Sequence, residues 1–148
     1  MSPRQRAFIL KVLKTHNVMT IATVRLDGWP QATTVAFASD GLNLYFACER
    51  SSQKVRNISR NRKVSLTVDH YCEDWDEIRG ISLGGSARVV TPPREFQQAL
   101  RLLRRKFPQY REMGEADLEG LAIVRVTPKV VSLLDYGKGF GHTELVKV

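Results

Sequence analysis

The chain has 148 residues, of which 43% are hydrophobic and 26% charged, so it is long and apolar enough for one domain with a sizeable core. No apolar run approaches the roughly 20 residues of a membrane-spanning helix, and the N-terminus lacks the apolar stretch and cleavage site of a signal peptide. We therefore expect a cytoplasmic protein without membrane contact and a single domain over residues 1–148.

The net charge of +8 arises from 23 Lys and Arg against 15 Asp and Glu. It favours phosphorylated ligands or polyanions, without choosing between a nucleotide and a nucleic acid. The two cysteines, Cys48 and Cys72, have no C-x-x-C spacing, and the three histidines are far apart in the sequence. Neither a disulfide framework nor a metal site is expected.

Residues 1–17 are predicted to form an N-terminal helix. Ser2 can cap it, Pro3 suits its first position, and Gln5 completes a capping box. The apolar side chains that follow fall on one face at helical spacing: Phe8, Ile9, Val12 and Leu13. We expect this helix to pack over one end of the β-structure that comes after it.

Three strand patterns follow, over residues 18–26, 31–38 and 42–48. Asp27-Gly28 predicts a hairpin turn between the first two, and Ser39-Asp40-Gly41 a second turn before the third. Pro30 requires an edge strand or a strand start. The expected arrangement is a meander of three consecutive antiparallel strands.

A short helix is predicted after the third strand, entered at Ser51-Ser52, before the chain returns as a strand over residues 64–68. Ser52 is a good N-cap, because its hydroxyl can bond the free amides of the first turn. Those amides carry the positive end of the helix dipole, yet Lys54 lies among them, with Arg50 and Arg56 on either side. A bound phosphate would resolve this conflict; the alternative is a solvated basic helix face.

Four acidic residues and Trp75 lie within residues 70–77, a predicted surface loop. Trp75 could cover a pocket, anchor the loop or lie in a dimer interface. A strand over residues 78–90 carries glycines typical of a bulge or a tight bend, and a helix then runs from Thr91-Pro92-Pro93 to Pro108. A turn of helix over residues 115–119 precedes two strands, 121–126 and 130–134, separated by Thr127-Pro128-Lys129. The tail, residues 135–148, is predicted to be a glycine-rich loop.

Strand, then S-x-K opening a helix, then N-x-x-V-S-L-x-V returning as a strand, resembles the pyridoxamine 5′-phosphate oxidase-like flavoproteins, the FMN-binding split-barrel family. The resemblance extends from Val18 to Leu134. It implies a mainly β fold with helices, an antiparallel split β-barrel of six to seven strands with peripheral helices. In that family the Ser and Lys of an S-R-K run hold the FMN phosphate. Here Ser52 and Lys54 match, and Gln53 replaces the Arg.

The resemblance also implies other site residues. The backbone of the second strand would run beside the flavin ring, together with the end of the third strand; these residues are Thr33, Thr34, Val35, Ala36, Ala47 and Cys48. Two subunits of the family share two sites along their interface, so we expect a homodimer. Side chains that could contact the substrate or the partner subunit's site are Trp75, Tyr136, Lys138 and Phe140.

The expected function is an FMN-dependent oxidoreductase acting on a small organic substrate. The chain lacks the R-L-x-P type ending of the vitamin B6 enzyme, so it is interpreted as a relative of that enzyme. The sequence identifies no catalytic acid, base or nucleophile. A split-barrel binding protein for FMN, the deazaflavin F420 or haem, without turnover, stays open. A nucleic-acid-binding barrel is a weaker alternative, because residues 50–63 contain no aromatic side chains among their basic residues.

Overall fold

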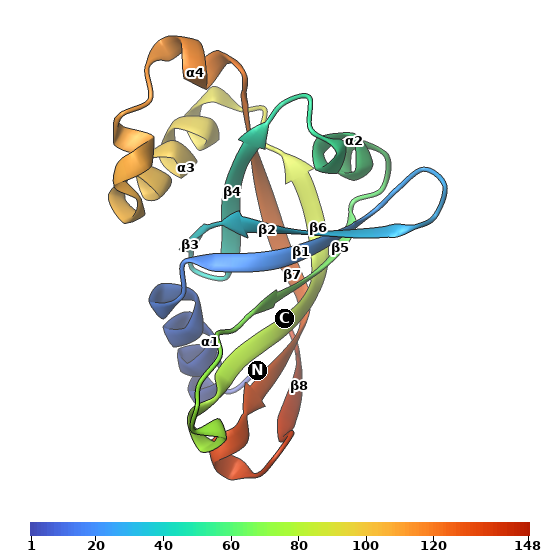
Figure 1. Ribbon diagram of the computed structural model, residues 1–148, viewed down its shortest axis with the longest axis vertical. Coiled ribbons are helices and arrows are strands. Elements are labelled where there is room, and N and C mark those ends of the chain that lie inside the picture. Colours follow the sequence, from blue (N-terminus) through green and yellow to red (C-terminus); the bar gives the residue numbers. More distant parts are fainter.

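The computed structural model describes all residues, 1–148, as one curled antiparallel sheet flanked by helices (Figure 1). The helices are α1 (Pro3–Thr15), α2 (Gln53–Arg60), α3 (Pro93–Lys106) and α4 (Glu115–Glu119), with 3₁₀ turns η1 (Trp75–Glu77), η2 (Pro108–Arg111) and η3 (Tyr136–Lys138). The strands are β1 (Val18–Val24), β2 (Pro30–Ala36), β3 (Ala38–Asp40), β4 (Asn43–Glu49), β5 (Lys63–Val68), β6 (Arg79–Val89), β7 (Leu121–Asp135) and β8 (Thr143–Lys147). None of the helices has the length and hydropathy required to cross a bilayer.

The strands follow the order β2-β1-β5-β6-β7-β4-β3, and β8 pairs with the second half of β7. All neighbours are antiparallel. The two strands at the ends of this order, β2 and β3, are joined through the single residue Phe37. Because consecutive residues connect the two ends, the sheet has to curl round on itself. The predicted mainly β class and split barrel with peripheral helices are therefore confirmed.

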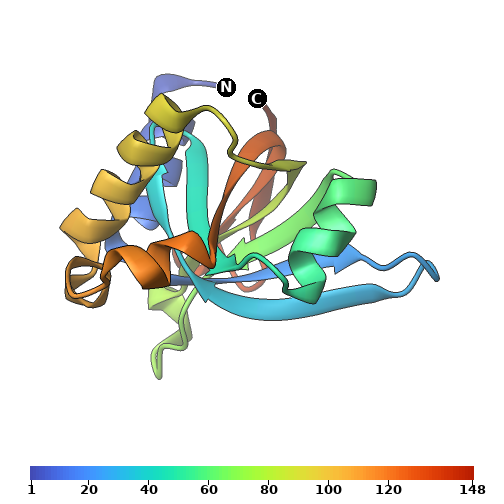
Figure 2. The same ribbon diagram turned by 90° about the horizontal axis from the view of Figure 1, so that it is seen from above.

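The main core fills the inside of the curled sheet. Phe37 and Phe46 are fully buried there, and α1 contributes Ile9, Val12 and Leu13 from the face predicted to be apolar. A second, smaller core lies under α3, where Leu100 and Leu103 pack near Tyr45 and Ile123. The alternation of strand residues explains both cores, because odd and even positions of β4 face opposite sides of the sheet. Figure 2 shows α3 and α2 on opposite sides of the strands.

The predicted meander is wrong. The β1–β2 hairpin forms as expected, with Gly28 at φ +86° in its turn and Pro30 at the start of an end strand. The third strand, β4, pairs with β3 and β7 instead of β2. The buried Phe37 leads the chain from one end of the strand order to the other, and its amide donates to the carbonyl of Asn17 at 3.1 Å. Alternation indicates which side chains are buried, but it does not identify the partner strand.

The prediction of two separate strands after residue 120 is also wrong, because β7 runs unbroken through Pro128. Pairing with β6 shifts between Gly84 and Gly85, so that Gly84 faces Val130 and Gly85 faces Pro128. Lys129 is the extra residue of this bulge. Pro128 is tolerated because the ladder of hydrogen bonds is already interrupted there. The tail differs too: the predicted loop contains η3 and the strand β8.

Candidate functional site

The start of α2 lies directly beyond the end of β4, where the sequence places its S-x-K run. Ser52 has the extended backbone of an N-cap, with φ −66° and ψ 154°, as predicted. Its hydroxyl, however, makes no capping hydrogen bond and instead lies 3.6 Å from the sulfur of Cys48. The first turn contains no acidic residue. The first amides of α2 are consequently left without a side-chain acceptor, which is the arrangement that favours an anion.

The cations around this helix start differ in their contacts. The Arg50 guanidinium donates to the carbonyl of Leu121 at 3.1 Å. Arg56 donates to the carbonyl of Ser51 and, at 2.7 Å, to the side-chain oxygen of Gln53. The Lys54 ammonium takes part in no hydrogen bond or salt bridge within the chain. It is half-buried in the first turn, where the helix dipole opposes a positive charge. Lys54 is therefore the cation available to a ligand.

Gln53 faces the protein, in contrast to the phosphate contact that its place in the S-x-K run implies. Its side-chain amide donates to Oδ1 of Asn57 at 2.8 Å. Asn57, only 1% exposed, in turn donates to the hydroxyl of Thr23 at 2.9 Å and to the side-chain oxygen of Gln31 at 3.2 Å. This network fastens α2 to β1 and to the start of β2. Sequence reasoning missed it, although Asn57 shares the face of Val55 and Ile58.

The predicted ring-lining residues fall on two strands near α2. Thr33, Thr34, Val35 and Ala36 belong to β2, which has no partner on its outer side, and only Val35 packs against the main core. Ala47 and Cys48 form the end of β4, which touches β2 without pairing with it. Burial raises the pKa of the Cys48 thiol. Figures 1 and 2 both place α2 beside the β1–β2 hairpin, so these segments gather around one corner of the molecule.

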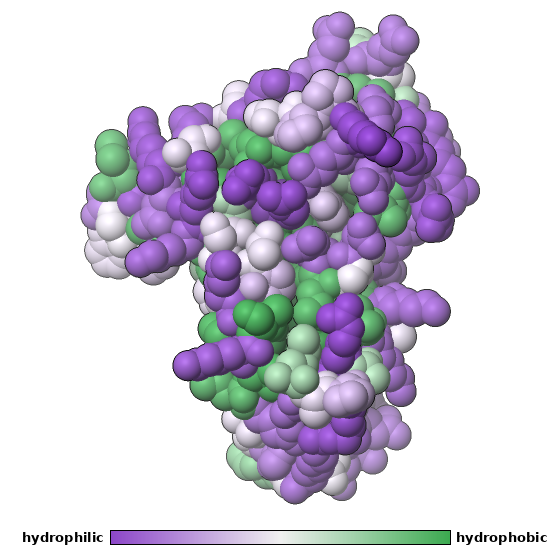
Figure 3. Space-filling model, turned by 180° about the vertical axis from the view of Figure 1, so that it is seen from behind, coloured by the Kyte–Doolittle hydropathy of each residue, from purple (hydrophilic) through white to green (hydrophobic).

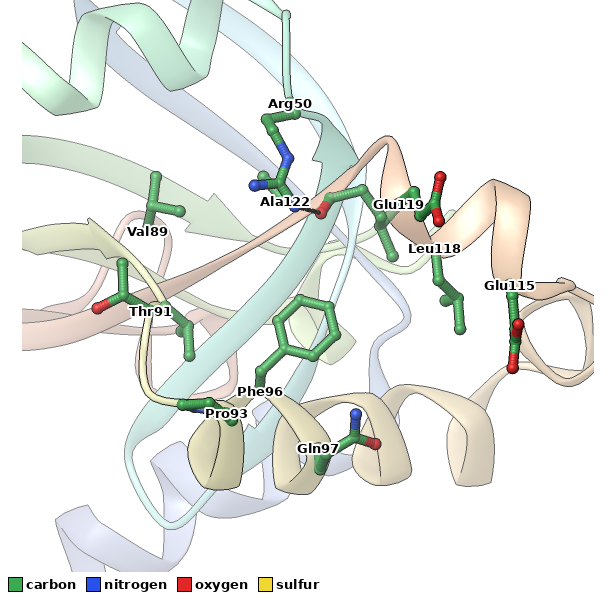
Figure 4. A pocket seen from close by; sticks show the side chains of 12 residues that line it. Arg50, Val89, Thr91, Pro93, Phe96, Gln97, Glu115, Leu118, Glu119 and Ala122 are labelled. Carbon is green, nitrogen blue, oxygen red and sulfur yellow. Dashed lines mark hydrogen bonds between the residues drawn. The ribbon is translucent and has the colours of Figure 1, made fainter.

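A pocket of about 640 Å³ opens between the ends of β4 and β6 and the helices α3 and α4, and its lining reaches Arg50, two residues before Ser52. Figure 4 shows Arg50 above it, hydrogen-bonded to a backbone carbonyl, and the Phe96 ring reaching in from α3. Its remaining walls combine apolar side chains with carboxylates, including Val89, Leu118, Glu115 and Glu119. The mixture of apolar walls with a few charges suits a small organic molecule. Sequence reasoning missed this pocket, because Phe96 has the spacing of a core residue.

The predicted substrate or partner contacts cluster elsewhere, at the opposite end of the molecule from α2 (Figure 1). Trp75 stacks on Phe140 with ring centroids 5.7 Å apart, and Tyr136 meets Phe140 edge-on at 5.4 Å. Lys138 lies 2.6 Å from Glu144 in an ion pair. Trp75 therefore contacts the tail of its own chain while staying exposed, and none of these side chains approaches the start of α2 in the same subunit.

Comparison with known proteins identifies the fold. The family model for pyridoxamine 5′-phosphate oxidase matches residues 6–135. A haem-binding protein from Mycobacterium smegmatis is 16% identical with a TM-score of 0.82. The match covers 99% of this chain and 59% of the length of that protein. A Listeria innocua structure provisionally described as a pyridoxamine 5′-phosphate oxidase is 19% identical with a TM-score of 0.72. The match covers 88% of this chain and 98% of the Listeria chain.

The haem storage protein HutZ from Vibrio cholerae is also similar, at 14% identity and a TM-score of 0.67, covering 81% of this chain and 87% of its own. No curated protein matches the sequence. The likeness to these solved structures concerns the fold, whereas the family model extends across most of the sequence. The chain thus belongs to the pyridoxamine 5′-phosphate oxidase-like family of FMN-binding split barrels.

Proposed function

We propose that this protein binds FMN and acts as an FMN-dependent oxidoreductase on a small organic substrate. The observation that carries the proposal is the start of α2: free amides, a Ser52 hydroxyl with no capping role, and a Lys54 ammonium without a partner in the chain. These groups fit a phosphate, which accepts several hydrogen bonds and neutralises a cation held against the dipole.

In this proposal Ser52, Lys54 and the first amides of α2 hold the phosphate. The backbones of Thr33 to Ala36 and of Ala47 to Cys48 line the flavin ring. Gln53 acts indirectly, since it is hydrogen-bonded to Asn57 and positions the helix. The flavin, when bound, supplies the electron chemistry, and the chain supplies binding and orientation. The pocket beside Arg50 gives a substrate room close to these segments.

We also propose that two copies assemble into a homodimer with the cofactor sites at their interface. Figure 3 shows hydrophobic residues gathered over the middle of one face of the molecule. Large apolar side chains are exposed at several places, among them Val18, Trp29, Phe140 and Leu145. A second subunit could bring the aromatic cluster of Trp75, Tyr136 and Phe140 towards the start of α2 of its neighbour.

The first experiment is an absorbance spectrum of the purified protein from about 300 to 600 nm, where a flavin cofactor absorbs, followed by heat release and identification of any chromophore. Two flavin bands with FMN in the supernatant support the proposal. A colourless protein that also fails to bind added FMN contradicts it. Turnover is then sought with nicotinamide reductants and oxygen, because no residue of the site identifies the reaction by itself.

Lys54→Ala is expected to weaken FMN binding by about 1–3 kcal/mol, roughly 5- to 150-fold in Kd, the scale of a charge-assisted hydrogen bond. The matched control is Lys63→Ala, which removes the same charge from an exposed position at the start of β5. Titration of the apoprotein with FMN by fluorescence quenching measures both. If Lys54→Ala and Lys63→Ala bind FMN as tightly as the unaltered protein, the phosphate site is wrongly placed.

Binding of haem or F420 without turnover is the second candidate function. Two similar structures described as haem proteins favour haem. A haem iron needs an axial ligand such as His, Cys or Met. Near α2 the chain offers Cys48, whose sulfur packs against the main core. An intense Soret band after haem addition, with no uptake of FMN, would replace the first proposal by this one.

A further inference from the structure

A thiol and two imidazoles form a hydrogen-bonded chain that the cofactor site does not use. Nε2 of His16, at the C-terminal end of α1, lies 2.7 Å from Nδ1 of His70, which follows β5. Nε2 of His70 lies 3.3 Å from the sulfur of Cys72. The two rings are tilted at 46° with centroids 4.7 Å apart. His16, which is distant in the sequence, thus meets His70 and Cys72, two neighbours within one loop, in a defined order.

The buried end of this thiol–imidazole series, at His16, determines which nitrogen of each ring carries a hydrogen. Nδ1 of His16 lies 2.8 Å from the carbonyl of Val12, which can only accept, so this nitrogen carries a hydrogen. In the neutral ring Nε2 of His16 is then bare and accepts from Nδ1 of His70. Nε2 of His70 is in turn bare and accepts the hydrogen of the Cys72 thiol. His70 is therefore held in the tautomer that can take a proton from Cys72.

The geometry suits proton transfer rather than metal binding. The sulfur of Cys72 and the nitrogen of His16 lie on opposite sides of the His70 ring, each hydrogen-bonded to a different ring nitrogen. Three donors do not converge on one point, and no group of His, Cys, Asp and Glu side chains is placed to hold a metal. A thiol followed by two hydrogen-bonded imidazoles has the arrangement of an activated nucleophile, its base and a group that orients the base.

The chain of groups is open to small molecules. A pocket of about 300 Å³ is lined by both imidazoles, and Cys72 is half-exposed beside it. The other charged groups around the imidazoles come from four elements: Lys11 of α1, Glu77 of η1, Arg79 of β6 and Asp135 of β7. Arg79 and Asp135 pair at 2.8 Å. Two cations and two carboxylates therefore surround the imidazoles.

We propose that Cys72 is a reactive thiol, activated by the His70–His16 pair, which forms mixed disulfides with small disulfide compounds. Cys72 passes its proton to Nε2 of His70, and the thiolate attacks one sulfur of the compound. A sulfur–sulfur bond to Cys72 forms while the original one breaks, and the leaving thiolate departs with the electron pair and takes up the proton. The compound is reduced and Cys72 is oxidised. His16 is a positioning residue, because it acts through His70.

The test measures the reaction with dithiodipyridine, whose leaving group is coloured, in protein carrying Cys48→Ser so that Cys72 is the one remaining thiol. Each rate is divided by the rate of the same variant unfolded in urea. This ratio corrects for differences between samples in reagent concentration and in total thiol. Adding His70→Gln is expected to slow the native reaction at pH 7 by at least about tenfold, since general-base assistance contributes more than this in enzymes. Adding His16→Gln is expected to slow it by a smaller factor. His142→Gln, in the tail, is the matched control.

Circular dichroism establishes that each variant is folded before its rate is compared. Equal rates, within about twofold, for the proteins with and without His70 overturn the proposal, because general-base assistance is larger than that. A second arm exposes the unaltered protein to oxidised glutathione and locates the adduct by mass spectrometry. The adduct is expected on Cys72, and an adduct confined to Cys48 also overturns the proposal. Both readouts are independent of FMN, so they stand whether or not the cofactor proposal succeeds.

Discussion

Asn57 fixes the position of α2 with a single side chain. Its amide hydrogens go to Thr23 and Gln31, and its oxygen accepts from Gln53, so the polar atoms of this buried side chain are satisfied. A buried polar group is tolerated when its hydrogen bonds are complete, and it then favours one arrangement over others. The start of α2, with its S-x-K run, is thereby held against β1 and the start of β2.

Asn57→Ala is expected to lower the free energy of unfolding by about 1–3 kcal/mol, because it leaves buried partners without hydrogen bonds. Urea denaturation followed by circular dichroism measures the change. Gln109→Ala, at an exposed position outside the network, is the control and is expected to leave stability nearly unchanged. An Asn57→Ala protein as stable as this control would show that the Asn57 hydrogen bonds contribute little to the free energy of unfolding.

At the scale of elements, the bulge between β6 and β7 allows one long strand to pair with two partners on one side. The first half of β7 pairs with β4 and the second half with β8, while β6 follows both halves. Gly85 lies at the shift in register, with its Cα close to the carbonyl of Thr127. A Cβ at Gly85 would lie 2.5 Å from that oxygen, which belongs to the backbone and cannot rotate away.

Gly85→Ala is expected to destabilise the protein by about 1–3 kcal/mol, the usual cost of forcing extra atoms into a packed site. Gly120→Ala is the matched control, since a Cβ there meets nothing nearer than 3.9 Å. Thermal unfolding of both variants measures the difference. Equal melting temperatures would mean that the backbone at the bulge accommodates the added Cβ without loss of stability.

Glu144 joins the start of α1, the turn η3 and the strand β8. Its carboxylate accepts from Lys138 at 2.6 Å, from Arg4 at 2.9 Å and from Gln5 at 3.3 Å. These donors, Lys138 first, lower its pKa from 4.5 to about 2. A lowered pKa means that the folded state favours the carboxylate, so the contribution is complete above pH 4.5 and is lost as the pH falls towards 2.

Glu144→Gln is therefore expected to reduce stability slightly at neutral pH and to flatten the loss of stability in acid. The effect is small because the groups are partly exposed and screened by salt. Urea midpoints between pH 2 and pH 6, roughly the range over which carboxylates titrate, measure it. Two parallel curves, with and without Glu144, would mean that this carboxylate is not linked to folding.

At the scale of the molecule, the curled sheet leaves strand edges and apolar side chains uncovered in a single chain. The outer side of β2 has no partner, and exposed strand edges and apolar patches are usually covered in native assemblies. Light scattering after gel filtration is expected to give twice the 16.8 kDa mass of the chain. A mass that stays at that of one chain at high protein concentration contradicts the homodimer.

Features set by neighbouring residues could be predicted from the sequence. The capping box of Ser2 and Gln5, the turn at Asp27-Gly28 and the alternating burial of β5 all appear in the structure. The position of Ser52 and Lys54 at the start of α2 was predictable for the same reason. Backbone preferences and periodic burial depend on residues within a few positions, so one sequence contains the information.

Contacts between distant residues were decided by the tertiary structure alone. Four features depend on how the sheet curls: the partners of β4, the passage of β7 through Pro128, the anchoring of α2 by Asn57 and the meeting of His70 with His16. Periodicity indicates whether a side chain is buried, but it does not identify the residues against which that side chain packs. The S-x-K run therefore identified a candidate phosphate site from the sequence, whereas the hydrogen bonds that occupy the Gln53 side chain, and the absence of a partner for the Lys54 ammonium, follow from packing alone.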